Sequence, residues 1–213
     1  MEIHVNPLAY YNDNQQAFWE AAGIHINLSV TALLISMLIC IPVGVLIAHR
    51  LQIAQYVINA FNALRVLPSL VILFLALPYL GLGYRPSLIA LIILACPPVL
   101  INTYAGLRNV DRSVVESALG MGMAPLQILR RVELPLALPA IVAGIRTAAV
   151  EVVASATLAS FIGGGGLGDF ITRGYNLGEP GIMLVGAIPI ALLAIAIELV
   201  LGGLQRTFTT LTA

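Results

Sequence analysis

The sequence predicts an all-helical integral membrane protein with five transmembrane helices and one polar helix–glycine–helix loop. Hydrophobic residues make up 60% of the chain, charged residues only 9%, and the mean hydropathy is +0.99, whereas a water-soluble domain carries about 25% charged residues. Five apolar segments are each long enough to cross a bilayer core of roughly 30 Å. A single long polar stretch, residues 116–135, separates the third segment from the fourth. This combination excludes an ordinary soluble domain.

The N-terminal segment, residues 1–25, is polar and acidic, and we expect it to lie outside the cell membrane. It lacks the basic region and apolar core of a cleaved signal peptide. Phe18 and Trp19 suit a membrane interface. The first predicted span, Ile26–Ala48, contains no charged residue, and Pro42 is expected to kink it.

The second predicted span, Ile58–Leu80, and the third, Ser87–Leu107, both contain residues that are unusual inside a membrane. Arg65 lies within the second span, where an arginine ordinarily extends toward the nearer interface. Pro97 and Pro98 lie at the middle of the third span. Because paired prolines release backbone carbonyls that neighbours or water must satisfy, these two residues are candidates for a helix that lines a pathway.

The fourth predicted span, Leu138–Ile162, contains Arg146 and Glu151, and the fifth is Gly181–Leu204. A glycine-rich connection joins them. We find no internal repeat that would suggest a second bundle. The five spans therefore form one membrane domain, residues 26–206, followed by a short C-terminal tail, residues 207–213.

The arginines predict how the bundle is oriented. Five spans place the two termini on opposite sides of the membrane, and cytoplasmic loops are enriched in basic residues. We therefore expect the polar loop and the C-terminal tail to be cytoplasmic and the N-terminus to be outside. The arginines predicted on the loop side are Arg50, Arg65, Arg108, Arg112, Arg130, Arg131, Arg146 and Arg206, and those opposite are Arg85 and Arg173.

The first half of the polar loop has the pattern of a short helix. Ser113 and Glu116 have capping-box spacing, so Ser113 is expected to cap the helix while Glu116 reaches back to it. Gly120 and Gly122 are expected to end this helix, because glycine tolerates the left-handed conformation of a helix terminus.

The second half of the loop predicts another short helix. Pro125 suits its first turn, and Arg130 and Arg131 place positive charge at its C-terminal end. Pro135 is expected to prevent simple continuation into the next span. Its apolar face would consist of Leu126, Ile128, Leu129 and Val132.

These residues resemble the EAA loop of the permease subunits of binding-protein-dependent ABC importers. The family pattern is E-A-A, three residues, Gly, nine residues, Ile, one residue and Leu-Pro, and Ser117 and Val132 are the only departures from it here. The matching residues are Glu116, Ser117, Ala118, Gly122, Val132, Leu134 and Pro135. We refer to residues 108–136 as the EAA loop.

Four further segments are similar to the osmoprotectant branch of this family, which imports glycine betaine, carnitine and choline. They are residues 62–70, 97–107, 133–148 and 161–169, and the likeness covers roughly residues 20–206. The resemblance implies a type I importer permease in the bacterial inner membrane, with a fold like that of methionine permeases. A methionine-type amino-acid importer is the alternative within the family.

The resemblance also implies the partners. Two copies of an ABC ATPase subunit would dock on the EAA loop and bind ATP, so the permease itself would be neither an enzyme nor a cofactor protein. A second permease, homologous or identical, would complete the pathway. An extracytoplasmic binding protein would deliver the solute.

Several other functions are disfavoured by the residues themselves. Gly163, Gly165 and Gly168 match G-x-G-x-x-G, but a predicted span precedes them instead of a strand, so we interpret the segment as a flexible external turn or gate. The chain contains no lysine and hence no P-loop. Zero net charge argues against a nucleic-acid partner.

The histidines and cysteines predict neither a metal site nor a disulfide. His4, His25 and His49 are scattered along the sequence, and Cys40 and Cys96 are interpreted as buried hydrophobic residues.

Glu151 has two open interpretations. It lies about 18 Å into its predicted span, where a carboxylate is costly unless it faces a bundle interior or water. It is either half of a structural pair, with Arg146 or with a residue of a partner subunit, or a pathway residue for cationic solutes. Glu198 is expected to pair with Arg206 or Arg65, or to lie at the membrane interface.

Two other classes of membrane protein are disfavoured. An ion-coupled secondary transporter would require inverted repeats, and the sequence shows none. An intramembrane enzyme would require a nucleophile or a metal site, and the sequence shows neither.

Overall fold

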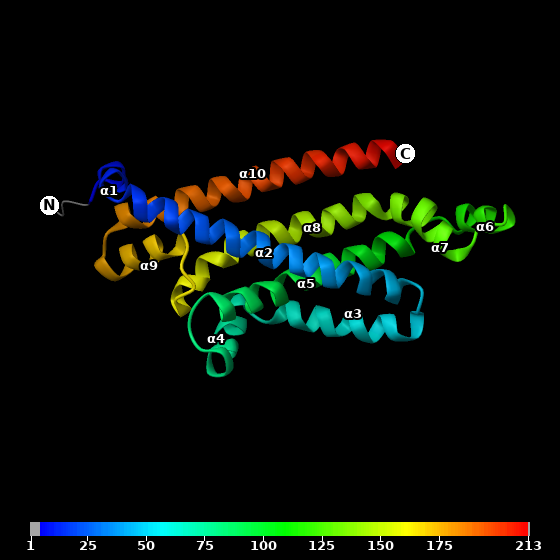
Figure 1. The fold of residues 1–213 in the computed structure, drawn as a ribbon, viewed down its shortest axis with the longest axis horizontal. Helices are drawn as coiled ribbons and strands as arrows, with labels where there is room; N and C mark the ends of the chain where they lie inside the picture. The colour runs from blue at the N-terminus through cyan, green and yellow to red at the C-terminus, as the bar shows by residue number, and fades with distance from the viewer. Residues whose placement is uncertain (1–4, 213) are drawn as a thin grey trace.

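The computed structural model describes residues 5–212, with side chains through residue 209, and every regular element in this range is a helix (Figure 1). Four helical runs are long and apolar enough to cross a membrane unbroken, and a bent pair completes five crossings if it is counted as one span. The five predicted spans are therefore found. The runs are α2 (Gln15–Ala48), α5 (Tyr84–Arg108), residues Pro125–Ile162, α10 (Pro180–Thr212), and the pair α3 (Leu51–Val66) with α4 (Ser69–Leu80).

The second span differs from the prediction because it is broken. Helices α3 and α4 meet at an angle of 96°. The break is at Pro68, which forces Leu67 into an extended conformation with φ −71° and ψ 126°. Because α3 begins at Leu51, Arg65 lies in its last turn beside the bend. It therefore lies roughly 20 Å from the start of α3, and the expectation that it lies near the EAA-loop end of its span is wrong.

The ends of the first and last helices also extend beyond the predicted spans. Short helix α1 (Pro7–Asp13) precedes α2, which begins at Gln15, inside the predicted N-terminal segment. Helix α10 continues to Thr212, so the predicted tail is helical as far as the structure describes it. Residues 1–4, which include His4, lie outside the described range.

The core of the bundle is formed by α2, α5 and α8 (Leu134–Ala156). Small residues allow α5 and α8 to approach closely: a Cβ added at Gly106 would lie 2.8 Å from that of Ala140, and one added at Gly144 would lie 2.6 Å from that of Asn102. Small residues at such crossings are typical of membrane helices, which pack by contact rather than by exclusion of water. Buried side chains at the centre are Leu28, Ala32, Cys40, Leu91, Ala95, Val99, Leu100, Ala148 and Val152.

The two ends of the bundle are different in character (Figure 1). The described N-terminal part of the chain and helix α9 (Gly168–Leu177) lie at one end. The opposite end carries α6 (Arg112–Gly120), α7 (Pro125–Ile128) and the end of α10. Since α5 and α8 are the helices directly before and after the EAA loop, their tight packing joins the two arms of that loop inside the bundle.

Candidate functional site

The first helix of the EAA loop is capped by Asp111, not by Ser113. The Asp111 side chain accepts a hydrogen bond of 2.8 Å from the backbone N–H of Ser113, and α6 begins at Arg112. This bond lowers the pKa of the Asp111 carboxyl, because hydrogen bonding favours the charged form. The predicted capping box from Ser113 to Glu116 is therefore wrong, since Ser113 already lies in the first helical turn.

The break between the two loop helices is at Gly122, as predicted. Helix α6 ends at Gly120, and Gly122 has a φ of +81°, a conformation that glycine adopts without steric cost. A Cβ added at Gly122 would meet nothing within 4 Å. The backbone conformation, not crowding within the subunit, therefore favours glycine here. Pro125 is the first residue of α7, which confirms its predicted position.

The motif residues divide into one that holds the loop together and several that face outward. Ala118 is only 2% exposed and packs inside the loop, whereas Glu116, Ser117, Gly122 and Pro135 are exposed. Val132 and Leu134 are half-buried. Large apolar side chains are also exposed on this polar loop, namely Val114, Leu119, Met121 and Leu126. Of the predicted apolar face of the second loop helix, Ile128 is buried and Leu129 and Val132 are half-buried, whereas Leu126 is exposed.

The loop runs into the next span without a break. A π-helical turn, η1 (Leu129–Glu133), joins α7 directly to α8, and Pro135 lies in the first turn of α8. The prediction that Pro135 would prevent continuation is wrong. Proline is tolerated in the first turn of a helix, where its missing N–H has no helical partner. The wider π-helical turn that precedes Pro135 allows α8 to start at this position without a break in the helix. A continuous helix thus runs from α7 through η1 into the bundle.

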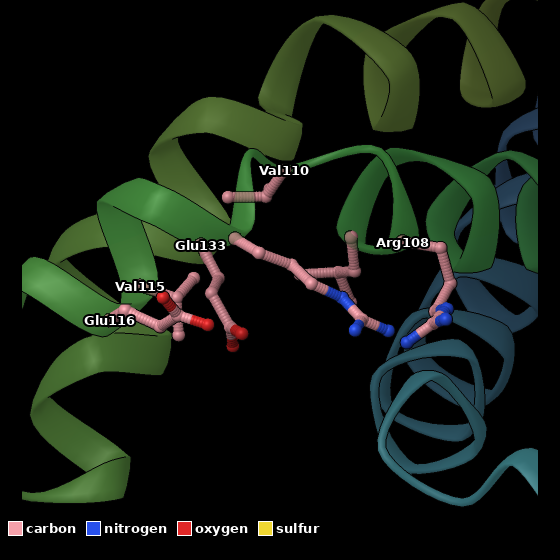
Figure 2. A pocket seen from close by; sticks show the side chains of 7 residues that line it. Arg108, Val110, Val115, Glu116 and Glu133 are labelled. Carbon is pink, nitrogen blue, oxygen red and sulfur yellow. The ribbon is translucent and has the colours of Figure 1, made fainter. Parts of the chain in front are cut away.

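A charged hollow of about 240 Å³ lies at the base of the loop (Figure 2). Its acidic side chains are Glu116 of α6 and Glu133 of η1, and its basic side chains are Arg108 of α5 and Arg112 of α6. Glu133 also accepts a hydrogen bond from His49, whose Nε2 lies 3.0 Å from Oε2 of Glu133. The hollow brings together residues from both arms of the loop, which no sequence spacing indicated.

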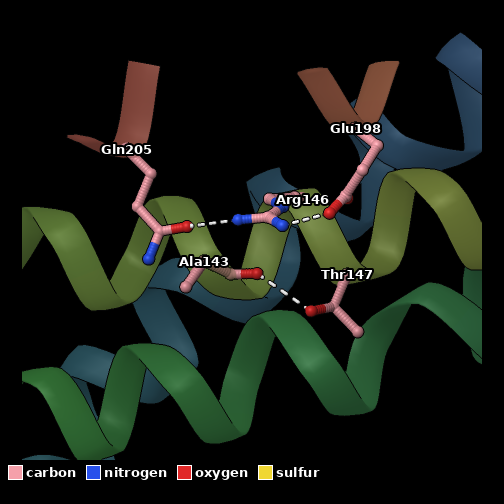
Figure 3. Close-up of polar contacts among 5 residues, drawn as sticks. All are labelled: Ala143, Arg146, Thr147, Glu198 and Gln205. Atoms are coloured by element: carbon pink, nitrogen blue, oxygen red, sulfur yellow. Dashed lines mark hydrogen bonds and ion pairs between the residues drawn. The ribbon is translucent and has the colours of Figure 1, made fainter. Parts of the chain in front are cut away.

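Arg146 of α8 is held by two residues of α10 (Figure 3). It forms an ion pair with Glu198, and its Nη1 donates a hydrogen bond of 3.0 Å to Oε1 of Gln205. Neither predicted partner of Glu198, Arg206 or Arg65, is the observed one. This pair joins the two longest apolar helical runs of the C-terminal half near the middle of each run.

Glu151 is consequently not the partner of Arg146. It is half-buried in α8, and its carboxylate forms no hydrogen bond or ion pair with the part of the chain that the structure describes. The predicted pairing of Glu151 with Arg146 is therefore wrong, whereas pairing with a partner subunit stays a prediction.

The other candidate pathway residues are mostly enclosed. Pro97 and Pro98 are fully buried within the subunit, and the Pro98 carbonyl accepts a hydrogen bond of 2.8 Å from the Asn102 amide. Gly163 and Gly165 have φ of +72° and +75°. Gly165 packs on Ile24 of α2. Gly168 is the buried first residue of α9. The glycine-rich connection is thus packed against α2 rather than freely exposed.

Helix α9 presents polar side chains at the end of the bundle opposite the EAA loop. Arg173 donates a hydrogen bond of 3.1 Å to the hydroxyl of Tyr10. Arg173 and Asp169 line a hollow with Phe170, and desolvation raises the pKa of the Asp169 carboxyl. Among the described residues, no three His, Cys, Asp or Glu side chains converge as metal ligands would. Cys40 and Cys96 are buried free thiols, as predicted.

The sequence matches a known family over most of its length. Residues 40–210 match the family described as binding-protein-dependent transport system inner membrane component. The carnitine transport permease protein OpuCB of Listeria monocytogenes is 41% identical over 202 residues, which are 95% of this chain and 93% of that protein. The choline transport system permease protein OpuBB of Bacillus subtilis is 44% identical over 185 residues, 87% of this chain and 85% of that protein.

A solved structure has the same fold. A chain of the inward-facing MetNI methionine ABC transporter superposes with a TM-score of 0.80 at 22% identity, covering 91% of this chain and 97% of that one. At this level of identity the likeness concerns the fold alone. It confirms the predicted methionine-permease-like fold and carries no information about the solute.

Proposed function

The chain belongs to the family of binding-protein-dependent transport system inner membrane components, and on this basis we propose that it is the permease subunit of an ATP-driven importer of quaternary ammonium osmoprotectants. The solute class is that of glycine betaine, carnitine and choline. The observation that carries the proposal is the identity of 41–44%, over most of the chain, to permeases named for carnitine and choline transport. The methionine-type alternative rests on the fold alone.

The EAA loop is proposed to be the docking surface for an ABC ATPase. Exposed apolar side chains on a loop that is otherwise charged are typical of a protein–protein contact. Two ATPase subunits would bind the ATP, and a second permease, identical or homologous, would complete the pathway. Closure of the ATPases would move α6 and α7. Because α7 continues through η1 into α8, the movement would reach the core of the bundle.

Solute entry is proposed at the opposite end, where an extracytoplasmic binding protein would dock near α9. Selectivity would be supplied mostly by that protein, because aromatic cages recognise quaternary ammonium groups through cation–π attraction. Glu151, together with Gly163, Gly165 and Gly168, remains a candidate pathway or gate residue. An unpaired carboxylate within a span lowers the cost of moving a cation through a medium of low dielectric constant.

The transport proposal is tested with the reconstituted complex of the permease, its ATPase and its binding protein. We expect ATP-dependent uptake of labelled choline, glycine betaine or carnitine, and none of methionine. Uptake of methionine instead would overturn the solute class. Glu151→Gln is expected to slow uptake while leaving assembly and melting temperature near wild type. A wild-type rate in this variant would exclude a pathway role for Glu151.

The orientation is tested by cysteine labelling in a background without the two native thiols. A cysteine at Ser113, in α6, is expected to react with an impermeant maleimide only after cells are opened. A cysteine at Asn176, in α9, is expected to react in intact cells once the reagent can reach the outer face of the membrane. The reverse pattern would overturn the proposed cytoplasmic location of the EAA loop.

A further inference from the structure

His49, at the C-terminal end of α2, connects this helix to the base of the EAA loop. It follows directly after Ala48, the last residue of α2, and Glu133 is the last residue of the π-helical turn. The imidazole Nε2 lies 3.0 Å from Oε2 of Glu133, and Nδ1 lies 3.0 Å from the carbonyl oxygen of Val45. The side chain of Glu133 is only 14% exposed, whereas that of His49 is 49% exposed.

The two contacts place one acceptor oxygen beside each ring nitrogen of His49. A backbone carbonyl and an ionised carboxylate both accept hydrogen bonds and cannot donate them. A neutral imidazole carries one N–H and can therefore satisfy only one of these acceptors, whereas an imidazolium carries two. Both contacts form at once when His49 is the imidazolium. A positive charge at the C-terminus of α2 is also favoured by the helix dipole.

The basic partner of Glu133 is His49 and not an arginine of the same hollow. Arg108 of α5 and Arg112 of α6 line the same hollow as Glu133, and Glu116 of α6 is the other acidic group there. Within the part of the chain that the structure describes, neither arginine approaches Glu133 within the 4.0 Å of an ion pair. Arg50, adjacent in sequence, begins α3 and is exposed. His49 is thus the basic residue that contacts Glu133.

We propose that His49 and Glu133 form a charge-assisted latch that transmits movement of the EAA loop to α2. This inference rests on the proposed function, since it assumes that an ATPase moves the loop. The loop is joined covalently to α5 and α8 alone. Glu133 lies where the loop becomes α8, so its bond to His49 gives α2 a direct polar contact with the loop, in addition to the packing of α2 on α5 and α8. Both residues are positioning residues, since they act through the helices and not on the solute.

The test compares His49→Phe, Glu133→Gln and the double variant in the reconstituted transporter, with solute uptake and ATP hydrolysis measured together. Each single variant is expected to reduce the solute imported per ATP by about two- to tenfold, the range for losing one ordinary hydrogen bond at a partly exposed site. The double variant is expected to be no worse than either single variant, because they break the same contact. Gln52→Ala, an exposed position in the first turn of α3, is the matched control and should behave as wild type.

A second measurement reports the protonation state directly. In ¹⁵N-histidine-labelled protein, the signals assigned to His49 by their loss in His49→Phe are expected to show both ring nitrogens protonated at neutral pH. They should revert to a neutral ring in Glu133→Gln. A neutral ring in the wild type would overturn the latch as described.

The outcomes separate this inference from the proposed function. A wild-type complex that imports no quaternary ammonium solute refutes the proposed function. A wild type that imports normally while all three variants keep its uptake per ATP refutes the latch. Variants that lose thermal stability but retain wild-type uptake per ATP would show that the contact is structural only, which also overturns the coupling role.

Discussion

Substitution of Gly144 by alanine is expected to separate the two helices that flank the EAA loop. Gly144 lies on α8 where it crosses α5. A Cβ at this position would lie 2.6 Å from the Cβ of Asn102 and 2.7 Å from the carbonyl oxygen of Pro98. Neither atom is the free end of a flexible side chain. Because carbon atoms in contact are ordinarily about 3.5–4.0 Å apart, the helices must move apart by roughly 1 Å.

The size of the effect follows from this overlap. Forcing an extra methyl group into a packed core costs about 1–3 kcal/mol. For a chain of this size each kcal/mol lowers the melting temperature by about 2–4 °C. Gly144→Ala is therefore expected to melt roughly 2–12 °C below an alanine variant at an uncrowded helical glycine, which gains the same helix propensity. Uptake should also fall, since the two arms of the EAA loop no longer pack at their native distance.

The assay is thermal unfolding of the detergent-solubilised protein, followed by the fluorescence of Trp19, the single tryptophan. Gly23→Ala is the matched control. Gly23 is also helical, but a Cβ there would meet nothing within 4 Å. Since alanine favours a helix over glycine by about 1 kcal/mol, this control should melt at or slightly above the wild-type temperature. If Gly144→Ala is as stable as Gly23→Ala, the close approach of α5 and α8 is refuted.

Three further predictions concern charges and the loop. Gly122→Asp should abolish uptake and weaken binding of the ATPase while the permease still inserts, because a φ of +81° disfavours any side chain; normal transport would contradict the docking role. Arg146→Gln and Glu198→Gln should each lower the melting temperature by leaving the other charge unpaired, whereas the double variant should recover most of the loss; additive losses would refute the pair. The lowered pKa of Asp111 stabilises α6 at neutral pH, and this stabilisation is lost as pH falls through the lowered value. Hydrogen exchange of α6 amides should show this loss, and Asp111→Asn, which caps a helix without ionising, should remove the pH dependence.

Much of the architecture depends on local properties that the sequence displays. The number of spans follows from runs of apolar residues that match the bilayer thickness. The break at Gly122 and the helix start at Pro125 follow from backbone preferences of single residues. The family follows from the EAA motif, whose spacing does not depend on the fold. These features are confirmed because each is decided within a few residues of chain.

Features that join distant segments were decided only by the tertiary structure. The partner of Arg146 is Glu198 and that of Glu133 is His49, and no periodicity indicates which helix lies beside which. Several local patterns were also compatible with more than one outcome. Asp111 and Ser113 are both residue types that cap helices. Because α5 ends at Arg108 and α6 begins at Arg112, Asp111 is the residue at the cap position.

Pro68 and Pro135 show most clearly that one residue type can have different structural outcomes in different tertiary contexts. Pro68 bends its span by 96°, whereas Pro135 begins α8 without a break because a π-helical turn precedes it. In both cases the missing N–H and the fixed φ are the same. What differs is whether the preceding turn widens into a π-helical turn, as it does at residues 129–133. A residue's conformational preference is local, but the free energy that decides whether the chain obeys it comes from contacts that form only when the bundle is assembled.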